Sequence, residues 1–254
     1  MSPEQIRSPR FLAAARWYVR RELARALDGL HVGGLEAARE LCRAHPVLLV
    51  SNHVCWWDPL VVLALDEALG TEGYALMDAE NLCGVPFFAR FGAIPLDRRS
   101  APRMRAGLRA AAALLDRPGR ALWIFPQGRH RPAHLRPLGF QPGVLLLARL
   151  APRAQLLPVA LQYAYAEGHN PAVFASFGEP VSASHAARAE DARCLEARVA
   201  AALGSIDRVL AGEAPPFPAL IPSRVRRPDR GFGSRMLAWT TGRGLRTEAR
   251  REHG

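Results

Sequence analysis

The stretch Val47-Leu48-Leu49-Val50-Ser51-Asn52-His53-Val54-Cys55-Trp56-Trp57-Asp58-Pro59 joins a strand signal directly to a helix signal. Its first four residues form an apolar run that follows a proline and predicts a short buried strand. Pro59 suits the first turn of a helix that extends to Leu69, and Gly70 stands just beyond its expected end. The polar residues between these two elements are therefore expected where the chain leaves the strand and enters the helix.

Apolar runs and helical patterns alternate along the rest of the chain. Further strands are expected at residues 74–77, 121–125, 156–161 and 172–177, and further helices at residues 103–115, 144–150 and 186–210. Strands that alternate with helices predict an α/β fold in which helices flank a mixed or mostly parallel sheet. We place this single domain at residues 31–213, a length that one hydrophobic core can support.

The N-terminal segment, residues 1–30, is predicted to form an amphipathic helix from residue 8 onward. Ser8 suits its N-cap and Pro9 its first turn. Apolar residues follow helical spacing, while arginines occupy the other faces beside Trp17 and Tyr18. Such a helix could lie on an anionic bilayer, or it could pack on the main domain with a solvated arginine face. The pattern leaves both alternatives open, because both need the same amphipathicity.

The C-terminal extension, residues 214–254, differs in composition from the rest of the chain. Four prolines mark a linker-like start, and nine arginines follow them. This composition favours a basic tail without a packed core. A second segment that contacts a membrane surface is the alternative, because Phe232, Met236, Leu237 and Trp239 lie among the arginines.

The charge of the chain predicts an anionic partner. The formal net charge is +11, and all 34 basic residues are arginines. A membrane surface, nucleic acid or a phosphorylated substrate would each fit this charge. The sequence lacks zinc-finger spacing, an aromatic recognition-strand motif and an obvious helix-turn-helix, so nucleic acid is not expected as a partner. An anionic membrane surface is the partner that we expect.

Membrane contact is expected to be peripheral and on the cytoplasmic face. No run approaches the roughly 18 apolar residues that span a bilayer, and arginines interrupt every apolar run near the N-terminus, so no signal peptide is expected. The four cysteines are scattered and fit a reducing compartment. No metal site is expected, because Pro132 between His130 and His134 predicts a loop, and Cys55 is expected to be a packed thiol.

His53 and Asp58 are the residues most suited to chemistry. A histidine at a strand end and an aspartate five positions later can fold back into a pair. The carboxylate then fixes the imidazole tautomer and leaves the second ring nitrogen free as a general base. By spacing alone, a structural histidine near a helix start is the more common case.

The residues around this pair resemble the glycerolipid acyltransferases of the lysophosphatidic acid type. Asn52, His53 and Asp58 match the family's Asn-His-x4-Asp motif. Gly92-Ala93-Ile94-Pro95-Leu96-Asp97-Arg98 is similar to its second block, which ends in an arginine implicated in acceptor binding. Phe125-Pro126-Gln127-Gly128 is similar to its third block, usually Phe-Pro-Glu-Gly, and Leu157-Pro158-Val159 to its fourth. The resemblance covers residues 46–180.

The resemblance implies an enzyme that moves a fatty acyl group from a thioester, acyl-CoA or acyl-carrier protein, to a hydroxyl of a lysophospholipid or related lipid. His53 would act as general base and Asp58 would orient it. The family uses no metal or cofactor and forms no acyl-enzyme. The resemblance also implies a set of substrate-binding residues: Asn52, Arg98, Phe125, Pro126, Gln127, Gly128, Arg129 and Arg131.

The third block departs from the family pattern, since Gln127 stands in the usual position of Glu and Arg129-His130 replace the usual Thr-Arg. Glutamine keeps hydrogen-bonding capacity but loses the charge. The chain therefore resembles a divergent Phe-Pro-Gln-Gly branch. Its arginines could still bind a phosphate, but a glycolipid or carotenoid glycoside fits as an acceptor too. A non-catalytic lipid-binding protein on the same fold is a further alternative.

Overall fold

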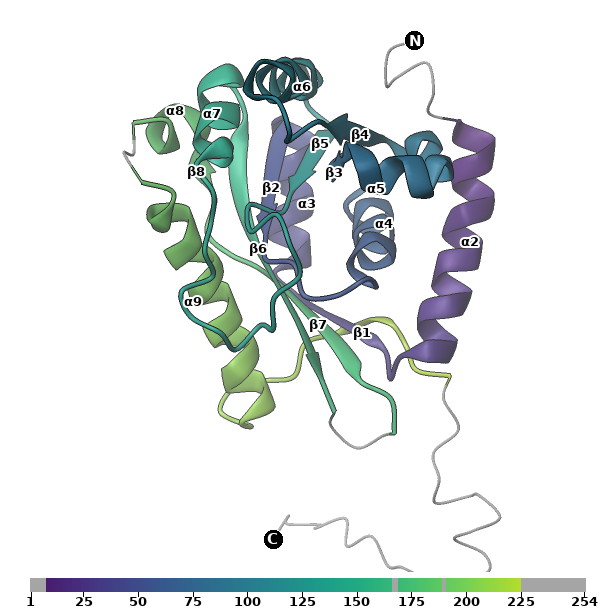
Figure 1. The fold of residues 1–254 in the computed structure, drawn as a ribbon. Helices are drawn as coiled ribbons and strands as arrows, with labels where there is room; N and C mark the ends of the chain where they lie inside the picture. Colours follow the sequence, from purple (N-terminus) through teal and green to yellow (C-terminus); the bar gives the residue numbers. More distant parts are fainter. Residues whose placement is uncertain (1–7, 166–168, 189–190, 225–254) are drawn as a thin grey trace, which may run out of the picture.

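A computed structural model describes residues 8–165, 169–188 and 191–224. One sheet runs through the molecule, and helices cover both of its faces (Figure 1). The strands are β1 (Leu30–Gly33), β2 (Val47–Ser51), β3 (Glu72–Asp78), β4 (Ala93–Leu96), β5 (Arg120–Ile124), β6 (Gln155–Ala164), β7 (Ala172–Phe177), β8 (Val181–Ser182) and β9 (Ala219–Ile221). The helices are α2 (Pro9–Ala26), α3 (Leu35–Ala44), α4 (Asp58–Leu69), α5 (Ala79–Gly84), the 3-10 helix η1 (Pro86–Phe91), α6 (Ala101–Ala113), α7 (Gly143–Leu150), α8 (Ala183–Ala186) and α9 (Arg193–Leu210).

The sheet is mixed and mostly parallel, as the sequence predicts. Its strand order is β4-β3-β5-β2-β6-β7-β1-β9, with β8 beside the start of β6. β4, β3, β5, β2 and β6 pair in parallel, and so do β7 and β1. β7 and β8 run antiparallel to β6, and β9 runs antiparallel to β1.

β2 lies in the middle of the sheet because all five of its residues can be buried. Its alternate side chains point to opposite faces. Leu48 and Val50 join the core beneath α6, α7 and α9, whereas Val47 and Leu49 join the core beneath α2, α3 and α4. A strand that is covered on both faces needs a continuous apolar run instead of alternation. α4 follows β2 and ends, as predicted, at Gly70, which has the left-handed conformation that glycine adopts without strain.

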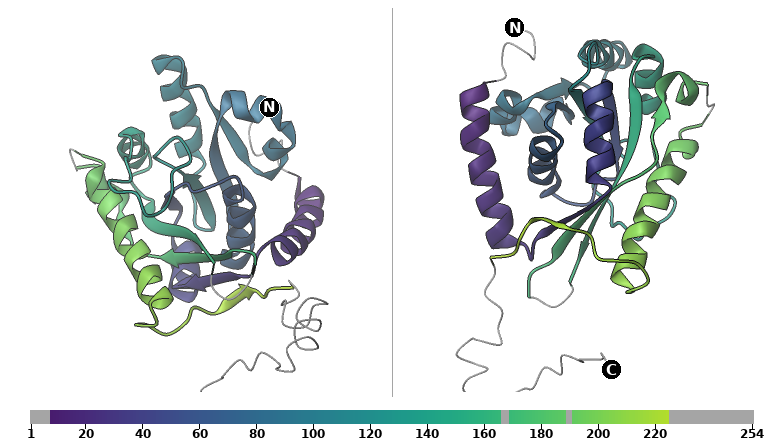
Figure 2. Two further views of the ribbon diagram at one scale, coloured as in Figure 1. Left: turned by 60° about the horizontal axis from the view of Figure 1, so that its bottom comes forward. Right: turned by 180° about the vertical axis from the view of Figure 1, so that it is seen from behind.

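α2 packs along the side of α4 (Figures 1 and 2). The Ser8 side chain caps it by accepting a 3.5 Å hydrogen bond from the Phe11 amide. Its apolar face, including Val19 and Leu23, is buried against the main domain, and Arg20 forms a 2.7 Å ion pair with Glu67 of α4. The packed alternative for this helix is therefore the observed one. The helix is shorter than the predicted 8–30, because the chain turns after Ala26 to enter β1.

Several further segments differ from the sequence expectations, and the sequence did not predict β4, β8, α5 or η1. β1 and α3 were missed, because β1 has four residues that include His31 and Gly33 and carries no apolar run. The predicted helix over 186–210 is divided into α8 and α9. β9 lies within the predicted extension 214–254 and pairs with β1, so the sheet continues past residue 213.

Residues 225–254 lie outside the described part of the chain. Within that part, no helix combines the length and apolarity that crossing a membrane requires.

Candidate active site

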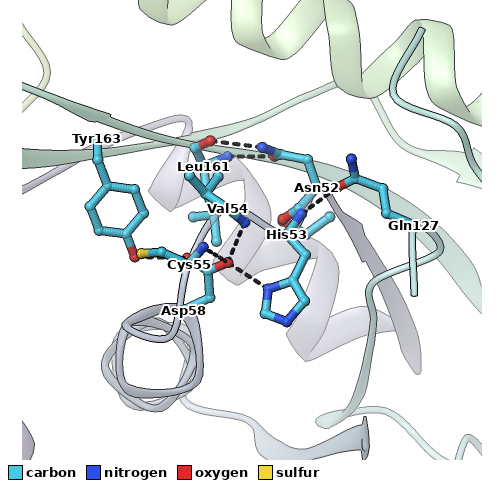
Figure 3. A network of polar contacts seen from close by, with 9 residues as sticks. Asn52, His53, Val54, Cys55, Asp58, Gln127, Leu161 and Tyr163 are labelled. Atoms are coloured by element: carbon cyan, nitrogen blue, oxygen red, sulfur yellow. Dashed lines mark hydrogen bonds and ion pairs between the residues drawn. The ribbon is translucent and has the colours of Figure 1, made fainter. Parts of the chain in front are cut away.

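Residues 52–57 form the loop that joins the carboxyl end of β2 to the start of α4. Asn52 begins this loop and is 1% exposed. Its side-chain amide exchanges two hydrogen bonds of 2.8 Å with the backbone of Leu161 on β6 (Figure 3). These bonds fix the loop against the neighbouring strand. The Asn52 side chain, predicted to contact substrate, is therefore engaged within the protein and positions His53.

His53 and Asp58 face each other across this loop. Nδ1 of His53 lies 2.6 Å from Oδ2 of Asp58 (Figure 3). The Asp58 side chain is 0% exposed, whereas the His53 side chain is 19% exposed. The carboxylate holds the ring hydrogen on Nδ1, so that Nε2 is left as an acceptor. Among residues 8–165, 169–188 and 191–224, no group hydrogen-bonds to this second nitrogen. The arrangement can therefore take a proton from a ligand hydroxyl.

The Asp58 carboxylate is surrounded by donors. Oδ2 also accepts hydrogen bonds from the amides of Val54 at 2.6 Å and Cys55 at 3.2 Å. Oδ1 accepts a 2.7 Å hydrogen bond from the hydroxyl of Tyr163 on β6. Burial raises the pKa of the Tyr163 phenol, and the charge of Asp58 raises it further, so the hydroxyl keeps its hydrogen. These bonds hold the carboxylate in one orientation. No local pattern pointed to Tyr163, which is 105 residues from Asp58 in the sequence.

Two rings from the loop after β5 pack against the His53 imidazole. Phe125 stacks on it, with ring centroids 4.4 Å apart and planes at 27°. His130 meets it edge to face, with centroids 4.1 Å apart and planes at 75°. In the sequence, the spacing of His130 and His134 raised only a metal site, which is not expected because Pro132 lies between them. Its position against His53 was missed because the two histidines lie on loops that follow different strands.

The backbone of His53 is held on both sides by the same loop. Its N–H donates to Oε1 of Gln127 at 2.5 Å, and its carbonyl accepts from the amide of Arg131 at 2.8 Å. Gln127 is 6% exposed, and its Nε2 donates to the carbonyl of Leu138 at 2.9 Å. Gln127 therefore connects the backbone of His53 to that of Leu138. This connection helps to fix the position of the imidazole.

The structure gathers the predicted binding residues of the second and third blocks beside the pair. Nη1 of Arg98 donates to the carbonyl of Gly128 at 2.8 Å, and the guanidinium lies where a side chain at Gly128 would project. Nη1 of Arg131 donates to the carbonyl of Leu138 at 3.0 Å. Arg129 is exposed, and Pro126 is buried below the loop. Within the described residues, the other guanidinium nitrogens of Arg98 and Arg131 have no protein hydrogen-bond partner and can bind a ligand.

Cys55 contacts the site without features of a nucleophile. Its sulfur lies 3.9 Å from Oδ1 of Asp58. Burial raises the pKa of the Cys55 thiol, which keeps it protonated. In the described residues, no cluster of three or more His, Cys, Asp or Glu side chains is arranged to hold a metal ion. The His53 imidazole, paired with its carboxylate, is a group in the site that can move a proton.

A family model described as "Acyltransferase" matches residues 29–162, which is more than half of the chain. The chain belongs to the acyltransferase family. Its fold is similar to the crystal structure of the 1-acyl-sn-glycerophosphate (LPA) acyltransferase PlsC from Thermotoga maritima, with a TM-score of 0.52, 18% sequence identity and coverage of 79% of each chain. A search of curated proteins gives no match.

The Gln127 side chain explains a departure of this acyltransferase from the family pattern. It accepts a hydrogen bond from the His53 amide and donates one to the Leu138 carbonyl. An amide can do both, whereas a carboxylate can only accept. A glutamate at this position would place an oxygen against the Leu138 carbonyl, so the loop of this acyltransferase requires glutamine.

We expect Gln127→Glu to destabilise the acyltransferase by about 1–3 kcal/mol at pH 8, because a buried acceptor then faces a second acceptor. Only a protonated carboxyl can donate to Leu138, so the folded variant binds a proton more tightly than the unfolded chain does. Its stability relative to wild type should therefore fall as the pH rises from 5 to 8. Denaturant unfolding at both pH values measures this difference. Gln141→Glu, the same change at an exposed position of the loop, is the control, and an equal loss in both variants would contradict the interpretation.

Glu196 anchors the far side of this loop. It lies on α9, is 8% exposed, and accepts hydrogen bonds from the amides of Leu138, Gly139 and Phe140 at 2.6, 2.9 and 3.0 Å. The carboxylate thereby holds the backbone of residues 138–140 against α9. Glu196 lies outside the region that the family model matches, and no pattern in the sequence connects it to the motif.

We expect Tyr163→Phe to lower the kcat of the acyltransferase by about tenfold with little change in KM, because Asp58 loses one charge-assisted hydrogen bond. Steady-state kinetics measures the change. Tyr74→Phe is a matched control, since the Tyr74 hydroxyl donates a 2.7 Å hydrogen bond to another carboxylate, that of Glu72. That variant should lose stability and keep its kcat. An unchanged kcat in Tyr163→Phe would show that Asp58 is oriented without this bond.

Proposed function

We propose that the protein transfers a fatty acyl group from acyl-CoA or acyl-carrier protein to a hydroxyl of a lysophospholipid or related lipid acceptor. The observation that carries the proposal is the pairing of Nδ1 of His53 with a fully buried Asp58 carboxylate, 2.6 Å apart, in a member of the acyltransferase family. The second imidazole nitrogen is open to a ligand, which is the arrangement that a general base needs.

The reaction follows from this geometry. Nε2 of His53 takes the proton of the acceptor hydroxyl, and the acceptor oxygen attacks the thioester carbonyl carbon. The Asp58 carboxylate stabilises the imidazolium that forms. When the tetrahedral intermediate collapses, the C–S bond breaks and the thiolate takes the proton from His53. The chain needs neither a nucleophile of its own nor a metal or cofactor for these steps.

The acceptor that the loop arginines favour carries a phosphate. Arg129 and Arg131 lie on the loop that contacts His53, and Arg98 reaches this loop at the Gly128 carbonyl. Guanidinium groups bind phosphate through forked hydrogen bonds. Because Gln127 is engaged in holding His53, it does not select between a phosphate and a sugar. A glycolipid or carotenoid glycoside remains the alternative acceptor, and a lipid-binding protein without activity is the alternative function.

A thiol-release assay tests these alternatives. Purified protein is given a long-chain acyl-CoA, or in a second arm an acyl-carrier protein thioester. The acceptors are lysophosphatidic acid, other lysophospholipids and a glycosylated lipid alcohol, each run beside His53→Ala. Release that requires both an acceptor and His53 supports the proposal and names the donor and acceptor. If no thiol is released in either arm, the proposed acyl transfer is contradicted and the alternative is a lipid-binding protein without activity.

We further propose that the enzyme acts while bound peripherally to the cytoplasmic face of an anionic membrane. The outer face of α2 exposes 65% of Trp17 and 54% of Tyr18, and the Arg21 guanidinium lies 5.6 Å from the Trp17 ring centroid. Aromatic side chains beside arginines suit the boundary between headgroups and water. Because the apolar face of α2 is buried in the protein, these exposed aromatic residues supply the membrane contact.

We expect Trp17→Ala/Tyr18→Ala to weaken binding to anionic liposomes by about tenfold or more. In this variant, membrane binding no longer removes two large apolar side chains from water. Flotation with anionic and neutral liposomes measures this. Leu210→Ala is the control, since Leu210 is 38% exposed at the end of α9, on the opposite side of the molecule from α2 (Figures 1 and 2). Equal flotation of all three proteins would contradict a contact through α2.

A further inference from the structure

His130 contacts the imidazole of the His53–Asp58 pair. Asp58 lies at the Nδ1 edge of His53 and is fully buried, whereas His130 is exposed to solvent. The two imidazole rings are in edge-to-face contact, with centroids 4.1 Å apart. A ligand bound at the second nitrogen of His53 therefore lies within a few ångströms of the His130 ring.

Hydrogen bonds on either side hold His130 in this place. The preceding turn is closed by the Gly128 amide, which donates to the Phe125 carbonyl at 3.0 Å, and Gly128 takes a φ of +64° that favours glycine. The following residue, Arg131, donates its amide to the His53 carbonyl at 2.8 Å. The residue next to His130 is therefore bonded to the backbone of His53. This bond limits how far the His130 ring can move relative to the His53 ring.

The His130 imidazole is suited to donate a hydrogen bond. Burial lowers the pKa of His130, and the positive charge that His53 can carry lowers it further, although the Asp58 carboxylate acts in the opposite direction. A neutral imidazole has one N–H donor and one acceptor nitrogen. In the portion of the chain that the structure describes, no protein group hydrogen-bonds to this ring, so its donor is open to a ligand.

The reacting atoms lie close to this pair of rings. An acceptor hydroxyl that gives its proton to Nε2 of His53 lies about 3 Å from that nitrogen, and the carbonyl carbon that it attacks lies about 3–3.5 Å further on. We propose that His130 is a second catalytic residue, whose ring N–H donates a hydrogen bond to the thioester carbonyl oxygen as that oxygen becomes negatively charged. The inference rests on the proposed acyl transfer and names its oxyanion donor.

The electrons and the proton balance in this step. The acceptor oxygen forms a bond to the carbonyl carbon as its proton moves to Nε2 of His53, and the C=O π electrons move onto the carbonyl oxygen, where the N–H of His130 stabilises them. When these electrons re-form the C=O bond, the C–S bond breaks and the thiolate receives the proton from His53. His130 keeps its hydrogen throughout. A single such donor contributes about 10²–10³-fold in rate.

Two substitutions separate hydrogen bonding from ring packing. His130→Phe keeps a flat ring to pack against His53 but has no N–H, whereas His130→Gln loses the ring and keeps a donor. We expect His130→Phe to lower kcat by about 10²-fold with KM for donor and acceptor within about threefold of wild type. His130→Gln should retain about a tenth of the wild-type kcat or more. His134→Gln, an exposed histidine four residues further along the loop, should match wild type.

Steady-state kinetics on the full chain, with the donor and acceptor that the wild type uses, gives the result. A wild-type kcat in His130→Phe, or a larger loss in His130→Gln than in His130→Phe, would overturn the inference, because packing would then be the contribution of the ring. A raised KM with an unchanged kcat would overturn it too, since the role would be binding. If the wild type transfers no acyl group to any acceptor, the proposed function falls and this inference falls with it.

Discussion

His53→Ala is expected to lower the kcat for acyl transfer by about 10³-fold, the largest single effect in this protein. The imidazole is the group placed to take the acceptor proton, and general-base catalysis contributes about 10²–10⁴-fold. KM should change little, because the imidazole contacts the hydroxyl most strongly while the proton moves. Single-turnover transfer from a labelled thioester measures the residual rate.

The His53→Ala variant needs a control for folding. The His53 backbone bonds to Gln127 and Arg131 remain possible with an alanine side chain, so we expect the melting temperature to stay close to that of wild type. His134→Ala changes an exposed histidine of the neighbouring loop and should leave the rate unchanged. Retention of more than a tenth of the wild-type kcat by His53→Ala would show that another group removes the proton.

Asp58→Asn is expected to have an effect of similar size, about 10³-fold in kcat, through the imidazole that it orients. An amide that turns its NH₂ toward Nδ1 holds the ring hydrogen on Nε2, and a protonated Nε2 cannot accept the proton of the acceptor. The variant also loses a charge that accepts from Val54, Cys55 and Tyr163. We expect a loss of stability of about 2–3 kcal/mol, because buried donors then meet a neutral amide.

Activity and stability can be separated for this substitution. Asp66→Asn removes another buried charge of α4, which accepts hydrogen bonds from Thr71 at 3.0 Å and Trp123 at 2.9 Å. It should lower the melting temperature while leaving kcat near wild type. The double variant His53→Ala/Asp58→Asn should be no slower than His53→Ala alone, because the two residues act as one unit. Fully additive losses would mean that Asp58 acts independently of His53.

Local sequence was enough to predict the central unit of the fold. The run 47–50 can only be buried on both faces, and Pro59 and Gly70 mark the limits of the helix that follows, so β2 and α4 form close to their expected bounds. β1 and β9 could not be predicted in this way. Both are short: β1 is a strand because it pairs with β7, and β9 is a strand because it pairs with β1 at the edge of the sheet.

The sequence by itself determined the mostly parallel α/β fold and the candidate pair His53 and Asp58. The strand, loop and helix signals are adjacent in the chain, so they define a short loop whose two ends can meet. Only the tertiary structure decided what surrounds the pair. Tyr163 comes from β6 and His130 from the loop after β5, and Glu196 of α9 holds the far side of that loop. Tyr163 and His130 meet the pair because β5 and β6 pair with β2 on either side, and strand pairing of this kind joins segments whose separation in sequence carries no local signal.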